Sequence, residues 1–194
     1  MSPGLIVVLV LAGLFGIMIP VAGILAAIAI PNFIIFQSRS KQAEVKANLR
    51  AAYTAERACF EVKNTFSSSP EEVGFVPERG NRYAYLFDQR GPLLERRALE
   101  EEPMGPGHTG IDVDRFKYQG LEPFDQTWLK ATYAGEARLG VKGRCPDCGI
   151  VIAAVGNIDN DPDLDVWSIA TFPRTGPKGE SIPAGVPFND LSDL

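Results

Sequence analysis

The sequence predicts an α+β protein in which one long N-terminal helix carries a mostly antiparallel β-sheet. Three observations lead to this prediction. Residues 5–30 are uncharged and almost wholly apolar. The next segment is charged, has the apolar period of a helix, and contains no Gly or Pro from Asn32 to Thr65. Beyond it, short runs of strand-like alternation are separated by Gly, Pro, Asn and Asp.

We therefore divide the chain into three parts. Residues 1–31 are the hydrophobic transmembrane half of the helix, residues 32–63 its amphipathic half, and residues 64–194 a globular β-rich head with an irregular C-terminal tail. No Asp, Glu, Lys or Arg precedes Arg39, and residues after Lys63 carry 13 basic and 21 acidic side chains, a balance of −8. An acidic head argues against a nucleic-acid partner, because phosphates favour a basic surface.

The apolar run is long enough to cross a membrane, since it exceeds the roughly 18 residues typical of such a helix. A cleaved signal peptide is the main alternative, and Ala27-Ile28-Ala29 imitates its cleavage site. Such peptides have a basic N-terminal region and an apolar region of about 7–15 residues. This run is longer and follows no basic side chain. We therefore expect a retained anchor.

We expect one continuous helix from about Leu5 to Val62. Pro20 and Pro31 each remove one hydrogen bond from it and bend it. In its second half, one face is apolar at three- and four-residue spacing, which predicts that the head packs against this face. The residues of this face are Val45, Leu49, Ala52, Ala55, Cys59 and Val62.

A short second helix is predicted at Pro70, with Ser69 as its N-cap and Gly74 close behind. The aromatic run 82–87 predicts the first strand. Residues 91–120 show little helical or strand periodicity. We interpret them as a long surface loop with a short strand near 116–118.

Residues 128–133 and 137–141 alternate and are each predicted to form a strand. The clearest pair is 149–156 and 164–171, which we expect to form an antiparallel hairpin because the connector 157–163 is rich in Asn and Asp. After Pro173 the chain is expected to be irregular.

Cys145 and Cys148 stand in a Cys-Pro-Asp-Cys motif. They fit an extracytoplasmic disulfide, half of a zinc site, or a redox pair. The softest further zinc ligands are Cys59 and His108, which the sequence does not place nearby, and a redox motif of this kind precedes a helix rather than a strand. We expect a structural disulfide, with Cys59 as a buried thiol.

Asp159, Asp161, Asp163 and Asp165 alternate in the predicted hairpin loop. Oxygen ligands at alternate positions suit calcium. However, the Gly and Glu of an EF-hand loop are absent and Pro162 interrupts the run. The alternative is a solvated turn whose Asp side chains bond backbone amides. We expect no other cofactor, and no set of residues suggests an enzyme.

The apolar half ends in the run Gly23–Phe33. This run resembles the N-terminal helix signature of type IV pilins and type II secretion pseudopilins. The resemblance continues through residues 37–44 and 48–49, and the segment 74–83, the cysteine pair and the 156–167 hairpin are similar to the heads of larger type IVa pilins. The signature residues are Gly23, Ile24, Leu25, Ala26, Ala27, Ile28, Ala29, Ile30, Pro31, Asn32 and Phe33.

The resemblance implies a structural subunit or assembly component of a pilus or pseudopilus filament, in which apolar helices pack together in the core. It implies other pilin subunits, inner-membrane lipid and the assembly machinery as partners. It also implies a single pass of the bacterial inner membrane with the head outside, and a cell-surface filament after assembly. The alternative is a membrane-anchored extracytoplasmic binding module, dependent on calcium.

The N-terminus departs from the family pattern, in which a peptidase cuts after a Gly and a Glu follows. Alignment on Gly23 places Leu9 at the Gly, Val10 at the first mature residue and Leu14 at the Glu. We therefore expect a non-standard subunit, at a minor or tip position or retained in the membrane. The basic residues after the apolar run would by themselves place the head in the cytoplasm; the resemblance and the cysteine pair favour the outside.

Overall fold

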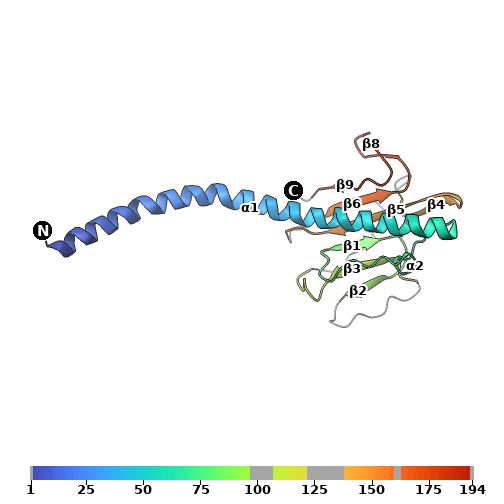
Figure 1. Ribbon diagram of the computed structural model, residues 1–194, viewed down its shortest axis with the longest axis horizontal. Coiled ribbons are helices and arrows are strands. Elements are labelled where there is room, and N and C mark those ends of the chain that lie inside the picture. Colours follow the sequence, from blue (N-terminus) through green and yellow to red (C-terminus); the bar gives the residue numbers. More distant parts are fainter. Residues whose placement is uncertain (1, 97–106, 122–137, 160–162, 193–194) are drawn as a thin grey trace. The chain divides into compact units, whose positions relative to one another are not determined.

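The structure is a computed structural model that describes residues 2–96, 107–121, 138–159 and 163–192. Residues 1–40 and 41–194 form two compact units. The first unit is helical throughout its described residues from Pro3, and the second contains the sheet (Figure 1). We describe each unit by itself.

The first helix, α1, spans Pro3–Lys63 and so confirms the predicted continuous helix. It contains Pro20 and Pro31 without ending at either of them. It ends where Asn64 takes a left-handed backbone conformation (φ 54°), a common way for a helix to stop.

The second helix, α2, is a single turn at Pro70–Val73, as predicted. Pro70 occupies the first turn, where its missing N–H costs nothing. Ser69 has the extended backbone of an N-cap, but its side chain makes no capping hydrogen bond. Gly74 ends the helix at φ 70°, a conformation that glycine adopts without strain.

In the part of the head that the structure describes, one sheet has the strand order β2-β3-β1-β5-β6-β9, with β4 paired to β5 as well. The pairing is antiparallel except between β2 and β3. The strands are β1 (Tyr83–Leu86), β2 (Leu93–Arg96), β3 (Gly110–Asp114), β4 (Gly140–Arg144), β5 (Asp147–Gly156), β6 (Asp165–Ala170) and β9 (Phe188–Leu191).

The predicted β5–β6 hairpin is confirmed, with Val151 opposite Ala170 and Gly156 opposite Asp165. Alternate residues of β5 point to opposite faces of the sheet. Ile150 and Ile152 belong to the cluster that includes the α1 residues, whereas Val151 belongs to a second cluster. The sheet is therefore buried on both faces at its centre, which explains why β5 is an almost unbroken apolar run.

The head part of α1 lies over the central strands of the sheet (Figure 1). Val45, Leu49 and Ala52 are fully buried there, as the helical period predicts. Cys59 is buried with a free thiol. The prediction is wrong for Val62, which is 82% exposed and lies beyond the end of the packed face.

Three other predictions about strands need correction. Residues 116–118 form a turn with no strand, and the strand in this region is β3, just before it. The strand expected at 137–141 is β4 and lies about three residues later. The tail after Pro173 is not simply irregular, because it contains β7 (Arg174–Thr175), β8 (Ser181–Ile182) and β9. The strand predicted at 128–133 lies outside the described residues.

Candidate functional site

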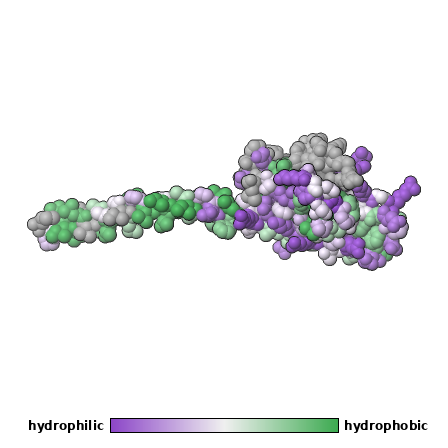
Figure 2. Space-filling view, turned by 90° about the horizontal axis from the view of Figure 1, so that it is seen from above, coloured by the Kyte–Doolittle hydropathy of each residue, from purple (hydrophilic) through white to green (hydrophobic). Residues whose placement is uncertain are grey.

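The first candidate for a functional surface is the apolar segment of α1. Its large side chains are between 44% and 67% exposed, and Figure 2 shows the segment as mainly hydrophobic. A helix that is apolar all round needs lipid or other helices around it. By length and composition α1 can cross a membrane. The exposed residues are Leu5, Ile6, Val7, Leu9, Leu11, Leu14, Phe15, Met18, Ile19, Val21, Ile24, Leu25, Ile28, Ile30, Phe33, Ile34, Ile35 and Phe36.

The signature residues Gly23–Phe33 all lie in this exposed segment. Pro31 has no N–H to leave unpaired, and the side-chain amide of Asn32 donates to the carbonyl of Ile28 at 3.0 Å. The one amide side chain of the signature is thus bonded to its own helix, which lowers its cost in apolar surroundings. Leu14 is 53% exposed and presents an apolar side chain.

The second candidate is a buried polar centre around Asp165, which is 0% exposed. Its carboxylate accepts hydrogen bonds from Tyr83 Oη at 2.7 Å and from Trp167 Nε1 at 2.6 Å. It also accepts from Asn189 Nδ2 at 2.8 Å and Gln42 Nε2 at 3.3 Å. These donors come from α1, β1, β6 and β9, so one carboxylate joins the helix to three strands.

Further polar contacts join α1 to the rest of the head. Asn48 Nδ2 donates to Tyr85 Oη at 2.7 Å, and Lys41 Nζ donates to the carbonyl of Ile158 at 2.5 Å. The ammonium of Lys46 lies 4.6 Å from the centre of the Trp167 ring. Burial strongly raises the pKa of Tyr83, with the neighbouring Asp165 carboxylate contributing, so this hydroxyl stays protonated as a donor.

The structure describes three of the four aspartates of the predicted calcium loop, and these three differ in burial. Asp159 and Asp163 are exposed, Asp165 is buried, and Asp161 lies outside the described residues. The Asp165 oxygens already accept four donors inside the head. Within the described ranges, no group of three or more His, Cys, Asp or Glu side chains is arranged to hold a metal ion.

Cys145 and Cys148 form a disulfide at the turn between β4 and β5, with their Cα atoms 4.6 Å apart. Both thiols are therefore used, as expected for a structural bridge. The hydroxyl of Thr65, just after α1, donates to Cys145 Sγ at 3.4 Å. The disulfide thus contacts the segment that connects the two helices.

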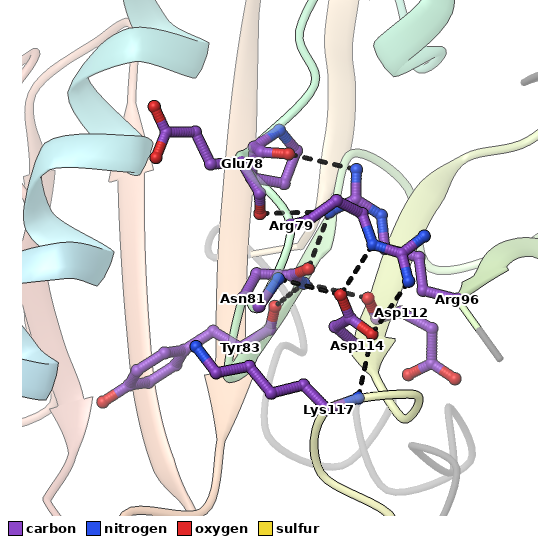
Figure 3. Close-up of polar contacts among 10 residues, drawn as sticks. Glu78, Arg79, Asn81, Tyr83, Arg96, Asp112, Asp114 and Lys117 are labelled. Atoms are coloured by element: carbon purple, nitrogen blue, oxygen red, sulfur yellow. Dashed lines mark hydrogen bonds and ion pairs between the residues drawn. The ribbon is translucent and has the colours of Figure 1, made fainter. Parts of the chain in front are cut away.

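A third polar group, which was not predicted, lies where β2 and β3 end and the chain enters β1 (Figure 3). Asp114 accepts from Arg79 Nε at 2.7 Å and from the N–H of Gly80 at 2.8 Å. The buried Arg96 donates to the side-chain oxygen of Asn81 at 2.8 Å. Burial alone would raise the pKa of Asp114, but the donors from Gly80 and Arg79 outweigh it and hold the pKa below its usual value.

Beside this group, a cleft of about 370 Å³ is lined by both acidic and basic side chains. Burial raises the pKa of Glu44 in this cleft, and the charges of Lys117 and Arg82 partly oppose the shift. A mixture of carboxylates, amides and cations can hold water or a small polar molecule, but it presents no nucleophile with a base beside it. The cleft is lined by Glu44, Asn48, Glu78, Arg79, Gly80, Asn81 and Lys117.

Comparison with known proteins identifies the family. Residues 36–165 match the family described as "Type IV pilin PilA". The chain is also 38% identical to "Type IV major pilin protein PilA" of Myxococcus xanthus (strain DK1622), in an alignment 194 positions long that covers 92% of this chain and 88% of the relative. This chain is a type IV pilin. The resemblance inferred from the sequence is confirmed, and the family match begins after the signature, so it covers the second half of α1 and much of the head.

Membership of this family also decides the class of function. Type IV pilins are structural subunits of pili, so this pilin is a structural protein and not an enzyme. Its long apolar helix fits a membrane anchor that becomes part of a surface filament. The polar groups around Asp165 and Asp114 accordingly serve the stability of the head.

Proposed function

We propose that this pilin is built into its filament through the apolar segment of α1, with the same segments of other pilin subunits as neighbours. Before assembly, residues 1–31 cross the bacterial inner membrane once, residues 32–63 carry the head, and the head lies outside the cytoplasm. The observation that supports this proposal is the exposure of the large apolar side chains of an uncharged segment, each between 44% and 67% exposed in the isolated chain.

The same surface suits both environments. Lipid chains surround it before assembly, and neighbouring apolar helices replace them in the filament. The exchange costs little because the segment has no charge to desolvate, and its Asn32 amide is bonded within the helix. Transfer from lipid to the filament would be performed by the assembly machinery of a pilus or secretion system.

In the family, the Glu of the N-terminal helix pairs with the N-terminal amine of a neighbouring subunit. We further propose that this pilin packs without that ion pair. Leu14 occupies the position that the alignment gives to the family's Glu, and it has no charge. A buried charge in the bilayer centre costs roughly 2.5–3.5 kcal/mol on insertion scales, so leucine lowers the cost of residence in lipid. A subunit without this pair suits a minor or tip position, or retention in the membrane.

Shearing of cells tests the proposal. We expect an epitope-tagged full chain in the sheared filament fraction, and immunogold labelling at filament ends rather than along their length. Labelling along the whole filament would contradict the tip position while preserving the filament function. Complete absence from sheared filaments, with recovery in the inner membrane, would contradict assembly.

Two measurements on the purified chain address the N-terminus. An intact mass that retains Met1 or Ser2 supports a chain that is not processed by the family's peptidase, whereas an N-methylated internal residue contradicts the alignment on Gly23. In cells, Leu14→Glu should change the amount of sheared protein if register in the filament depends on this position. Leu11→Gln, one turn earlier, is the control for polarity alone.

The location of the head outside the cytoplasm and the binding of calcium by the loop are separate proposals. Digestion of the head in spheroplasts by an external protease would support the outside location, and protection from digestion would contradict it. Calcium remains a proposal for Asp159, Asp161 and Asp163, since two of these are at the surface. Asp165 is left out because its oxygens face donors inside the head.

A further inference from the structure

A buried acid lies near the C-terminal end of α1. Glu56 is 0% exposed in the head part of the helix. Its Oε2 accepts the backbone N–H of Ser67 at 3.1 Å. Its Oε1 is buried and has no hydrogen-bond partner. An unsatisfied oxygen on a buried carboxylate is costly, and much more costly when the group is ionised.

Ser67 connects Glu56 to a second acid. The Ser67 hydroxyl donates to Oε2 of Glu72, in the first turn of α2, at 2.5 Å. The N–H of Ser69 donates to the same hydroxyl oxygen at 3.0 Å, while the hydroxyl of Ser69 is buried without a partner. One serine between the helices is therefore bonded to two carboxylates, one buried and one exposed.

The charged and titratable groups around Glu56 do not balance its charge. On α1 they are the Cys59 thiol and Lys63, on α2 there is Glu72, and Ser67 contributes a neutral amide. Lys63 is exposed in the last turn of the helix, so solvent weakens its attraction. Burial raises the pKa of Glu56 to about 7, with Glu72 adding to the rise and the Ser67 amide and Lys63 opposing it.

We propose that Glu56, Ser67 and Glu72 form a pH-sensitive contact between the end of α1 and the segment 66–73. When Glu56 is protonated, the segment stays packed on the helix. When Glu56 loses its proton, a buried negative charge faces a second carboxylate through one serine, and the segment opens so that water reaches the charge. The contact between α1 and the segment 66–73 therefore weakens as the pH rises.

The direction follows from linkage between protonation and folding. Because the folded pKa is above the usual value of 4.5, the contribution is complete below about pH 4.5. It is lost as pH rises through about 7 and does not fall further above that value. The opening equilibrium changes by at most about tenfold per pH unit within this range, since one proton is involved.

Hydrogen–deuterium exchange of the full chain in detergent micelles tests the proposal. After correction for intrinsic exchange, we expect the amides of 66–73 to exchange on the order of tenfold to a hundredfold faster at about pH 8 than at about pH 5. Glu56→Gln should remove this pH dependence. Glu72→Gln should keep it but move its midpoint to lower pH, because a repelling charge is gone. Glu61→Gln, an exposed acid on the same helix, should behave like the wild type.

If the amides of 66–73 in the wild type exchange independently of pH, the proposal is overturned. An unchanged pH profile in Glu56→Gln would overturn it as well. If Glu56→Gln does not fold, the Glu56 side-chain carboxyl of the wild type can be titrated by carbon NMR. A midpoint near 4.5 would overturn the proposal, and a midpoint near 7 that falls in Glu72→Gln would support it.

Discussion

The hydroxyl of Tyr83 reaches the carboxylate of Asp165 at 2.7 Å by crossing an intervening strand. Tyr83 on β1 lies opposite Gly156 on β5, and Gly156 lies opposite Asp165 on β6. A Cβ added to Gly156 would stand 2.7 Å from the Tyr83 ring. The missing side chain of Gly156 therefore makes room for the ring, and the ring carries its hydroxyl to Asp165.

Asp165→Asn should strongly destabilise the head. The amide would present N–H donors to neighbours that are themselves donors, leaving buried groups unpaired. We expect a loss of about 2–4 kcal/mol in the free energy of unfolding, measured by chemical denaturation of the full chain in micelles. Asp163→Asn, two residues away and exposed, should change it by less than about 0.5 kcal/mol. Equal effects of the two substitutions would contradict the buried centre.

Gly156→Ala should cost about 1–3 kcal/mol, because the new methyl group collides with the Tyr83 ring. Combination with Tyr83→Leu tests the cause. If the collision is responsible, the cost of Gly156→Ala in the Tyr83→Leu background should be smaller than in the wild type. Strict additivity of the two substitutions would show that the glycine is needed for another reason.

Asp114→Asn should make the head less sensitive to acid. The pKa of Asp114 is held below its usual 3.8, so its contribution to stability is present above that value and is lost as pH falls through the lower, folded pKa. We expect the variant to be less stable at neutral pH, with the difference from wild type shrinking below about pH 4. Thermal melting at several pH values measures this, with the exposed Glu71→Gln as control. A constant difference at every pH would contradict the assignment.

Replacement of both Cys145 and Cys148 by Ser should destabilise the head by only about 2 kcal/mol, because the bridge closes a very short loop. The effect should appear first as faster hydrogen exchange at the β4–β5 turn and at Thr65, which contacts Cys145. Cys59→Ser, a buried thiol on α1, should leave exchange at the β4–β5 turn unchanged. Global unfolding of the double variant would mean that the bridge has a larger role.

Millimolar calcium should raise the melting temperature of the full chain if the loop 159–163 binds the ion, since extracellular calcium sites work in this range. Asp163→Asn should abolish the increase. The same melting temperature with calcium and with chelator would reject the site, and magnesium serves as the control for ionic strength.

Much of the architecture could be predicted because it depends on patterns along the chain. The apolar run and the helical period of Val45, Leu49 and Ala52 predicted α1, and the runs of apolar and β-branched residues predicted the β5–β6 hairpin. Turn residues were equally informative, since Pro70 and Gly74 mark both ends of α2. These features are local, and local sequence preferences decide them.

Strands β2, β3 and β9 were missed for a common physical reason. Each is short and carries charged or amide side chains that are unfavourable in isolated strands. In β3, Asp112 and Asp114 are buried and accept hydrogen bonds. A segment whose charges are typical of a surface loop therefore forms part of the sheet. The alternation of Ile111 and Val113 was the available signal.

The sequence by itself determined the long N-terminal helix and its uncharged apolar segment around Leu14. Only the tertiary structure decided where the polar side chains go. It placed Asp165, expected in a calcium loop, at the centre of the head, and it buried Glu56, a charged residue that follows Ala52 by four positions on the packed face of the helix. The reason is that hydropathy and period are properties of neighbouring residues, whereas a carboxylate's role depends on donors that arrive from distant strands.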